Sequence, residues 1–327
     1  MNSNYFESES RSMLLLPGFL LNTDTATMIE HLTATNFTHC QRLFHGRGHA
    51  YENLSHVNVD WLSPVILITL YQAVDETWLL AQAKALQGLI SECKSVQVQR
   101  RYERFAPTQV LLGEAVNSTV VTENNLFYHI EFGKAQNSGL FLDMSNGRAW
   151  VKENAQEKNV LNLFAYTCAF SVAATAGGAK QVVNIDLSKA SLSKGRDNHQ
   201  LNKLAKKEGK KVIFEGVDIF KSNSRIKKYG KYDLLICDPP SFQKGSVNIE
   251  RDYAKIIRRI PQWMNAGAEL MLCLNSPDLD EHFLKEEVAR ECPDCVFQHK
   301  LANPEVFKEA HKGKGLKVLL FTYQPKN

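Results

Sequence analysis

Short apolar runs recur along the second half of the chain, separated by longer stretches of mixed polarity. The runs cover residues 159–164, 181–186, 211–218, 234–237, 268–275 and 316–323. Runs of this length, bounded by turn-forming residues, predict buried strands. The stretches between them predict helices at 171–177, 188–204 and 253–263. Strands that alternate with helices predict parallel βαβ units, so we expect a doubly wound α/β sheet.

The first half of the chain carries a weaker pattern. A strand-like run at 65–70 precedes a helical pattern at 76–89. These two elements predict a smaller α/β region ahead of the doubly wound sheet. We place the boundary after Gly133, which predicts an N-terminal α/β domain at 1–133 and a larger domain at 134–327.

Composition indicates an ordinary globular protein. The chain has 327 residues, 44% of them hydrophobic, which is enough for two domains with full cores. The apolar stretch at 13–21 is short, contains Pro17 and Gly18, and follows acidic residues, which argues against a signal peptide or a membrane span. Seven cysteines at scattered spacings favour reduced thiols in a cytoplasm over a disulfide framework.

A metal site is not expected. Cys292 and Cys295 form a CxxC pair, but no second pair completes a set of four zinc ligands. The pair therefore predicts a turn that carries two ordinary thiols.

The basic residues are unevenly distributed, although the net charge of +4 is too small to identify a nucleic-acid partner. They cluster at 194–211, 221–231, 258–259 and 311–317, and the segment 99–105 interleaves arginines with aromatic residues. Each cluster alone predicts a solvated surface. Several clusters around one site favour an anionic substrate such as RNA.

Acidic residues end three predicted strands of the larger domain. Asp186, Asp218 and Asp238 close the second, third and fourth of these strands. Ligands of doubly wound sheets bind beyond the carboxyl ends of the strands, so we expect these carboxylates at a binding site. Asp186 is suited to accept hydrogen bonds from a ribose diol, while strand-end capping is the simpler alternative for Asp186 and Asp218.

A nicotinamide dinucleotide also suits an acid at the end of the second strand. Against that alternative, residues 162–179 contain no GxGxxG motif, and Gly177 and Gly178 follow the predicted helix instead of preceding it. The sequence shows no pyrophosphate cradle.

The fourth strand stops at the segment Asp238-Pro239-Pro240-Ser241-Phe242. Prolines have no N–H for a strand ladder and bias the preceding residue towards an extended conformation. Asp238 and Pro239 are therefore expected in a stiff, open loop that presents groups to a ligand.

Several of these segments resemble the class I S-adenosylmethionine-dependent methyltransferases, and more narrowly the bacterial group that methylates bases of large-subunit ribosomal RNA. The similar segments are Asn162-Leu163-Phe164-Ala165-Tyr166-Thr167, Gly177-Gly178-Ala179, Asp186-Leu187-Ser188, Asn198 with Asn202, and Asp238-Pro239-Pro240-Ser241-Phe242. Upstream similarity is found at Gly139-Leu140-Phe141-Leu142-Asp143 with Arg148, and from Arg42 to Asp60. The resemblance covers residue 41 to the C-terminus and implies a Rossmann-like, seven-stranded methyltransferase domain.

The resemblance also implies roles for individual residues. The turn that begins at Phe164 would wrap the methionine part of S-adenosylmethionine, Asp186 would bind the ribose hydroxyls, and Asp218 would meet the adenine amino group. The cofactor-binding residues implied are Phe164, Ala165, Tyr166, Thr167, Asp186, Leu187, Ser188, Asp218, Ile219 and Asp238. Asp238, Pro239 and Phe242 are the implied catalytic residues, with Phe242 offering a face on which a base can stack, worth about 1–3 kcal/mol.

Three departures from the family pattern stand out. Met144-Ser145 replaces the usual Gln-Arg after Asp143. Cys168 occupies a position where the group usually has glycine. The stretch before Arg42 is short, so we expect the separate N-terminal RNA-binding module of many relatives to be missing or truncated.

The implied activity is transfer of a methyl group to a base of structured RNA, with ribosomal RNA expected first. Members of the group that make 5-methylcytosine carry a cysteine just after the fifth strand, where this chain has Asn275, and Cys273 lies two residues earlier. We therefore favour methylation of nitrogen over carbon. A 5-methylcytosine-forming enzyme and a catalytically silent RNA-binding or ribosome-assembly module are the alternatives.

Overall fold

The computed structural model of the chain describes residue 32 and residues 36–204, 209–240, 242–243, 247–311 and 313–326. The apolar stretch at 13–21 lies outside these residues. Within them, no helix has the length and apolar character that crossing a membrane requires.

A five-stranded sheet forms the N-terminal part of the described chain. Its strands, in spatial order, are β1 (Gln41–His45), β2 (Val57–Leu62), β3 (Val65–Leu70), β4 (Ser95–Arg100) and β5 (Thr108–Gly113). The helix α2 (Glu76–Leu89) connects the parallel strands β3 and β4, and Asp75 caps it by accepting a hydrogen bond from the Trp78 amide at 2.8 Å. The predicted strand at 65–70 and helix at 76–89 are confirmed.

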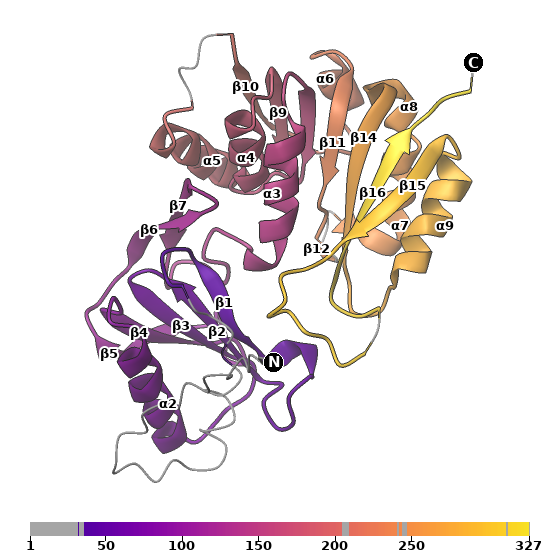
Figure 1. Cartoon of the computed structure of the whole chain (residues 1–327). Coiled ribbons are helices and arrows are strands. Elements are labelled where there is room, and N and C mark those ends of the chain that lie inside the picture. The colour runs from indigo at the N-terminus through magenta and orange to yellow at the C-terminus, as the bar shows by residue number, and fades with distance from the viewer. Residues whose placement is uncertain are drawn as a thin grey trace, which may run out of the picture.

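A β-hairpin and a helix connect this sheet to the rest of the molecule. The hairpin pairs β6 (Ser118–Glu123) with β7 (Leu126–Glu131), and lies between the two larger sheets in Figure 1. After it come the 3-10 turn η2 (Leu142–Met144) and the helix α3 (Ser145–Asn154).

The C-terminal half is a seven-stranded sheet with helices on both faces (Figure 1). Its strands, in spatial order, are β10 (Lys211–Gly216), β9 (Gln181–Asp186), β8 (Asn159–Leu163), β11 (Tyr232–Cys237), β14 (Met264–Asn275), β16 (Leu316–Tyr323) and β15 (Cys295–Leu301). The helices are α4 (Ala169–Ala176), α5 (Lys189–Leu201), α6 (Asn223–Lys227), α7 (Ile249–Ile257), α8 (Ile260–Trp263) and α9 (Glu281–Glu291). The predicted fold class, a seven-stranded Rossmann-like sheet behind a smaller α/β part, is confirmed.

Alternate residues of each central strand point to opposite faces of this sheet. In β11, Leu234 and Ile236 pack into the core beneath α3 and α4, while Leu235 and Cys237 pack beneath α6 to α9. A strand that is buried on both faces has no polar alternation, which explains the continuous apolar run in the sequence.

Three details of the sequence-based prediction are wrong. The sheet is not wholly parallel, because β16 runs antiparallel to both β14 and β15. The helix expected at 253–263 is two helices, α7 and α8, and Pro261 lies in the first turn of α8. The strand expected to reach Asp218 ends at Gly216.

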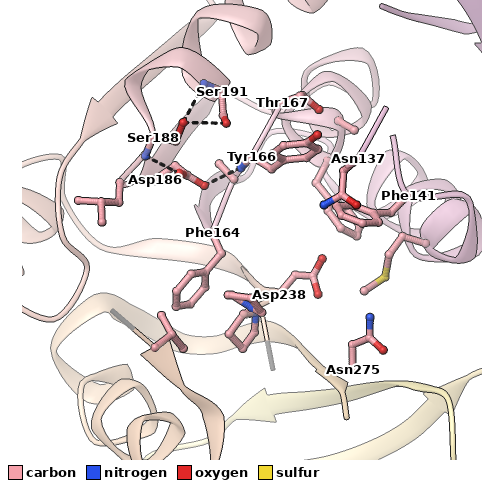
Figure 2. A pocket seen from close by; sticks show the side chains of 18 of the residues that line it. Asn137, Phe141, Phe164, Tyr166, Thr167, Asp186, Ser188, Ser191, Asp238 and Asn275 are labelled. Carbon is pink, nitrogen blue, oxygen red and sulfur yellow. Dashed lines mark hydrogen bonds between the residues drawn. The ribbon is translucent and has the colours of Figure 1, made fainter. Parts of the chain in front are cut away.

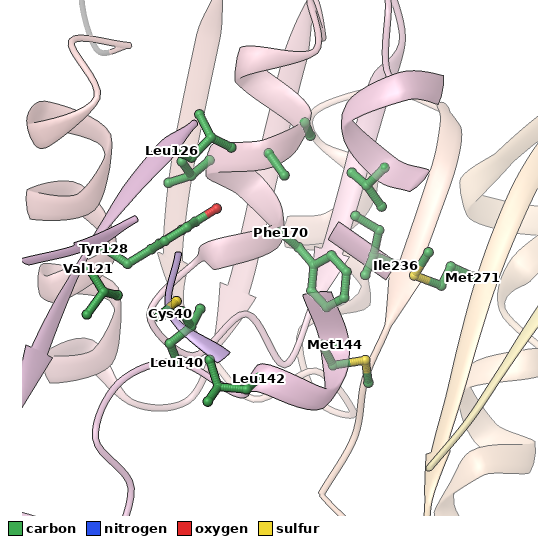
Figure 3. Close-up of a cluster of buried hydrophobic side chains, with 14 of the residues drawn as sticks. Cys40, Val121, Leu126, Tyr128, Leu140, Leu142, Met144, Phe170, Ile236 and Met271 are labelled. Atoms are coloured by element: carbon green, nitrogen blue, oxygen red, sulfur yellow. The ribbon is translucent and has the colours of Figure 1, made fainter. Parts of the chain in front are cut away.

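One hydrophobic core joins the hairpin, the segment before α3 and the seven-stranded sheet. Figure 3 shows Tyr128 of β7, Leu142 of η2, Phe170 of α4 and Ile236 of β11 among its buried side chains. Because these residues come from distant parts of the sequence, burial of this core fixes the hairpin against the sheet.

A buried ion pair reinforces this junction. Arg148 of α3 donates from Nε and Nη2 to the two carboxylate oxygens of Glu123 in β6, at 2.6 and 2.7 Å. The same Nη2 also donates to the carbonyl of Phe141 at 2.8 Å. The two charged side chains are only 3% and 5% exposed, so each is the other's main substitute for water.

Removal of one partner is therefore expected to be costly. Arg148→Met leaves the Glu123 carboxylate buried and uncompensated, and should lower the free energy of unfolding by about 3–5 kcal/mol. Chemical denaturation measures this loss. Lys134→Met is the control, because Lys134 is 68% exposed and its partner Glu131 also pairs with Lys194, so this change should cost far less stability. Equal losses in the two variants would contradict this role of the buried pair.

Candidate active site

A cavity of about 410 Å³ opens at the carboxyl ends of β8, β9, β10 and β11. Its lining includes every residue to which the family resemblance gave a cofactor-binding or catalytic role, except Phe242. These are Phe164, Ala165, Tyr166, Thr167, Asp186, Leu187, Ser188, Asp218, Ile219, Asp238 and Pro239. The structure thus brings together residues that are spread over 76 positions of the sequence, from Phe164 to Pro239.

In the turn after β8, every second residue has a strained, left-handed backbone conformation. Phe164, Tyr166 and Cys168 all adopt positive φ angles, of 58°, 47° and 60°. Such a conformation costs on the order of 1–3 kcal/mol at a non-glycine residue, and it clusters where a backbone surrounds a ligand. Cys168 therefore adopts a left-handed conformation that glycine would adopt without strain.

Asp186 fixes this turn against the next strand. One carboxylate oxygen accepts a hydrogen bond from the Tyr166 amide at 2.8 Å, and the other accepts from the Ser188 amide at 2.7 Å (Figure 2). Each carboxylate oxygen has a second lone pair, so Asp186 can still accept hydrogen bonds from a ligand in the cavity.

Helix α5 supports the turn from behind. Asn198 donates to the carbonyl of Thr167 at 3.1 Å and accepts from the His129 amide of β7 at 2.9 Å. Gly195 lies so close to the turn that a Cβ there would be 2.4 Å from the Cys168 sulfur. The hairpin, the helix and the turn are therefore packed as one unit.

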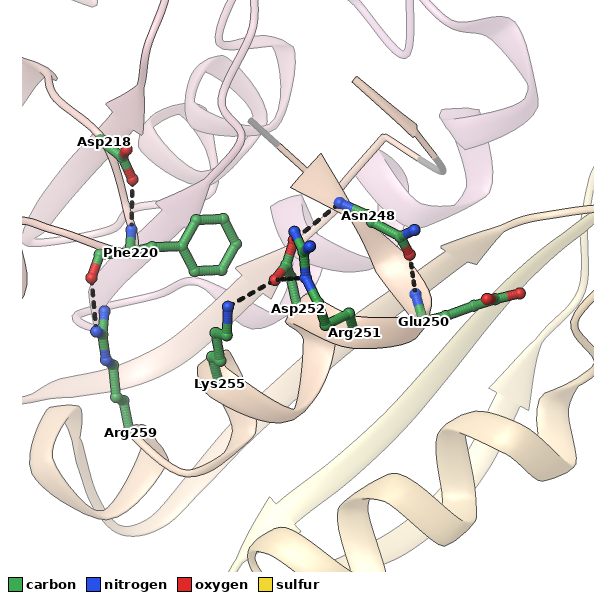
Figure 4. A network of polar contacts seen from close by, with 8 residues as sticks. All are labelled: Asp218, Phe220, Asn248, Glu250, Arg251, Asp252, Lys255 and Arg259. Atoms are coloured by element: carbon green, nitrogen blue, oxygen red, sulfur yellow. Dashed lines mark hydrogen bonds and ion pairs between the residues drawn. The ribbon is translucent and has the colours of Figure 1, made fainter. Parts of the chain in front are cut away.

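The loop after β10 forms the next wall of the cavity. Asp218 accepts a hydrogen bond from the Phe220 amide at 2.8 Å, and Arg259 of the α7–α8 junction donates to the carbonyls of Ile219 and Phe220 at 2.9 and 2.7 Å (Figure 4). The ring of Phe220 lies 6.4 Å from that of Phe164, between centroids. These contacts fix Asp218 and Ile219 at the edge of the cavity.

Asp238 follows β11 and lies on the opposite side of the cavity from Asp186. Figure 2 shows its carboxylate pointing towards the side where Asn137, Phe141 and Asn275 lie. Burial, together with the nearby carboxylate of Asp143 and against the opposing effect of Arg148, raises the pKa of Asp238 to about 7. Burial also raises the pKa of Asp143.

The expected base-stacking residue, Phe242, belongs to the short strand β12 (Phe242–Gln243), which pairs with β13 (Val247–Asn248). Its side chain lies outside the part of the chain that the structure describes, as does Ser241. The stacking role of Phe242 stays a prediction.

Sequence analysis assigned no role to one whole side of the cavity. Asn137, Phe141, Asp143 and Asn275 line it, and they come from the segment before α3 and the end of β14. The apolar-then-acidic segment 139–143 was a usable signal, because it ends in a carboxylate just ahead of the methyltransferase-like region. Asn137 gave no such signal.

The lining chemistry suits a nucleoside-type cofactor that carries no phosphates. Carboxylates lie at three strand ends, and the volume falls within the range of about 300–1,000 Å³ typical of small-molecule sites. Among the described lining residues, Arg148 is the only basic one, and Glu123 already binds it. A dinucleotide pyrophosphate would therefore find no cationic partner here, whereas the residues fit S-adenosylmethionine.

Other proteins share these features. A ribosomal RNA large subunit methyltransferase K/L from Psychrobacter arcticus is 36% identical over 172 residues, which are 50% of this chain and 22% of that protein. A ribosomal RNA large subunit methyltransferase I from Erwinia tasmaniensis is 31% identical over 67% of this chain and 57% of its own length. This chain therefore spans less than two thirds of either relative.

Among solved structures, SMU.776 in complex with SAH has the same fold, with a TM-score of 0.77 and 23% identity over 91% of this chain and 79% of that one. The family model of S-adenosylmethionine-dependent methyltransferases matches residues 41–322, which include both sheets and the whole cavity. The chain therefore belongs to the S-adenosylmethionine-dependent methyltransferase family, whose members are enzymes that take their methyl group from this cofactor.

Proposed function

We propose that this enzyme methylates a base of large-subunit ribosomal RNA, and that a ring or exocyclic nitrogen receives the methyl group. The observation that carries the proposal is the half-buried Asp238 carboxylate, which lines the cavity on the side away from Asp186. The names of the two relatives support ribosomal RNA as the substrate class.

The cofactor is assigned to the strand-end side of the cavity. The turn from Phe164 to Thr167 would surround its methionine part, and Asp186 with Leu187 and Ser188 would bind the ribose. Asp218 and Ile219 would bind the adenine. Tyr166 and Ser188 already orient the Asp186 carboxylate, so the ribose diol meets a preorganised acceptor.

The substrate base is assigned to the Asp238 side. The cofactor supplies a methyl group activated on a sulfonium sulfur. The Asp238 carboxylate accepts the N–H of the base and takes its proton as positive charge develops on the attacking nitrogen. Pro239 keeps the loop stiff, so that carboxylate and backbone carbonyls stay aligned, and Phe242 is expected to stack on the base.

The cysteines near the site favour attack by nitrogen over carbon. Cys273 and Cys237 are both fully buried, in β14 and β11. Burial raises the pKa of each thiol, and the charge of Asp238 raises both further. A nucleophilic thiolate is disfavoured at either position, and covalent activation of cytosine needs such a thiolate.

The cofactor assignment predicts the effect of removing Asp186. Asp186→Ala should bind S-adenosylmethionine at least tenfold more weakly, because it loses a charged acceptor for the diol; hydrogen bonds to charged groups are worth about 1.5–3 kcal/mol each. Calorimetry measures the affinity. Asp197→Ala, an exposed acid-to-alanine change on α5, should bind like the wild type. Unchanged affinity in Asp186→Ala would rule out the ribose contact.

The substrate assignment predicts methyl transfer to RNA that depends on Asp238. The wild type should incorporate labelled methyl groups from S-adenosylmethionine into isolated ribosomal RNA. Asp238→Asn should lower the rate by about 10²–10⁴, because an amide cannot accept the proton. Asp197→Asn removes the same charge elsewhere and should have no effect. Label that enters protein or small molecules but no RNA would overturn the proposal.

The same carboxylate predicts a pH dependence. Asp238 acts as a carboxylate, and its pKa is about 7, so kcat/KM for ribosomal RNA should fall as the pH drops through about 7. Asp143→Asn removes the charge that helps to raise this pKa, so the midpoint should move to lower pH. A midpoint that stays in place in Asp143→Asn would show that a group other than Asp238 controls the rate.

A further inference from the structure

A second cavity, of about 210 Å³, adjoins the cofactor cavity. It lies between the N-terminal sheet and the methyltransferase sheet, and is lined by parts of β2, β3 and β4, the segment 131–143, Asn275 and Phe307. Five lining residues belong to both cavities, namely Asn137, Leu140, Phe141, Asp143 and Asn275. A group that occupies the second cavity therefore reaches the side of the first one to which Asp238 points.

The loop between β15 and β16, which we call the C-terminal loop, helps to enclose this cavity. Its Ala310 amide donates to the carbonyl of Gly48 at 2.7 Å, and the Phe307 ring lies 5.0 Å from that of His45, between centroids. In Figure 1 this loop reaches from the seven-stranded sheet towards the β1 end of the N-terminal sheet. Both halves of the chain thus contribute to the second cavity.

Two arginines gather on one tyrosine ring at the β3 end of this cavity. The guanidinium carbon of Arg47 lies 4.3 Å from the centroid of Tyr71, and that of Arg101 lies 5.7 Å from it. Arg101 also donates to Gln99 at 2.9 Å and to the Gln136 carbonyl at 2.8 Å, which fixes its position. We call these three side chains, Arg47, Tyr71 and Arg101, the arginine–tyrosine stack.

Neither arginine of the stack has an acidic partner among the residues that the structure describes. Within the described part of the chain, no carboxylate lies within ion-pair distance of Arg47 or Arg101. Two acids that line the second cavity are engaged elsewhere, since Asp60 pairs with Arg42, and Glu131 pairs with Lys134 and Lys194. The third, Asp143, lies where the two cavities meet. Two like charges on one ring repel each other, and an anion bound between them would remove that repulsion.

The polarity of the joined cavities matches that of a nucleotide. The guanidinium groups of Arg47 and Arg101 lie at the β3 end, without an acidic partner among the described residues. The carboxyl group of Asp143 lies where the cavities meet, and that of Asp238 lines the first cavity. A nucleotide carries an anionic phosphate at one end and N–H donors on its base at the other. A nucleotide is matched in one orientation, with its phosphate at the guanidinium end and the N–H donors of its base at the carboxyl end.

We propose that the arginine–tyrosine stack binds a phosphate of the RNA strand, and that the second cavity admits the target nucleotide from there to Asp238. This inference rests on the proposed RNA methylation and adds the contact that positions the strand. Moving the target base out of its position between neighbouring bases of the RNA costs about a few kcal/mol, and phosphate contacts of this kind offset that cost.

The test uses the full chain and labelled fragments of large-subunit ribosomal RNA. Affinity for a nucleic acid falls as the salt concentration rises. Each phosphate contact adds about 0.9 to the steepness of log affinity against log salt concentration on a B-form duplex, and about 0.7 on a single strand. Arg47→Gln and Arg101→Gln should each lower the slope by about that amount, and the double variant by about twice as much. The affinity for S-adenosylmethionine should not change in any of them.

Two controls separate a phosphate contact from a structural effect. Arg290→Gln makes the same change of charge on α9, where Arg290 pairs with Glu287, and should keep the wild-type slope. Arg101→Lys keeps the charge but loses the bonds that fix the guanidinium, and should also keep most of the slope.

The outcomes are distinguishable. Wild-type protein that neither binds nor methylates the RNA would overturn the proposed function itself. Wild-type protein that does both, with an unchanged slope in the double variant, would overturn only the role of the stack. An equal loss in Arg101→Lys and Arg101→Gln would also overturn it, because Arg101 would then act by supporting the segment around Gln136.

Discussion

The ion pair between Arg148 and Glu123 determines where the two cavities meet. Arg148 bonds Glu123 of the hairpin and the carbonyl of Phe141 at the same time, so it connects the hairpin, the helix α3 and the segment before that helix. Phe141 and Asp143 lie in the walls of both cavities because this contact places their segment there. The buried core around Tyr128 and Phe170 keeps water away from the pair and so preserves its strength.

The same junction divides the site into regions of different charge. On the strand-end side, the Asp186 carboxylate is stabilised by backbone amides. At the junction, the half-buried carboxylate of Asp143 lies close enough to Asp238 to help raise the pKa of Asp238. At the far end, Arg47 and Arg101 lie on Tyr71 without acidic partners in the described chain. A cationic methyl donor, a base with N–H groups and a phosphate each have a region of complementary charge.

Local patterns predicted the parts of this structure that depend on local sequence. The buried strand β11 and the acids at strand ends were visible because a strand covered on both faces is continuously apolar and ends where polar residues begin. The edge strand β15 was not predicted, because five of its seven residues are exposed and carry no apolar pattern. The antiparallel direction of β16 depends on its tertiary neighbours and not on its own residues.

The second cavity lay beyond sequence reasoning for a related reason. Tyr71, Arg101 and Phe307 are far apart in the chain. The pairing of β3 with β4 brings Tyr71 and Arg101 together, and the docking of the C-terminal loop on the N-terminal sheet adds Phe307. The arginines of the segment 99–105 were noted as a basic cluster, but a cluster does not show which of its members lacks an acidic partner. In the structure, Arg100 pairs with Glu76, whereas Arg101 faces the cavity.

Nucleoside mass spectrometry of ribosomal RNA methylated by the purified enzyme tests most directly the claim that Asp238 prepares a base nitrogen for methylation. The structure leads us to expect an N-methylated nucleoside, in amounts that do not change in the Cys273→Ser variant. A 5-methylcytidine product that disappears in Cys273→Ser would contradict the account, because a buried thiol with a raised pKa would then be the nucleophile.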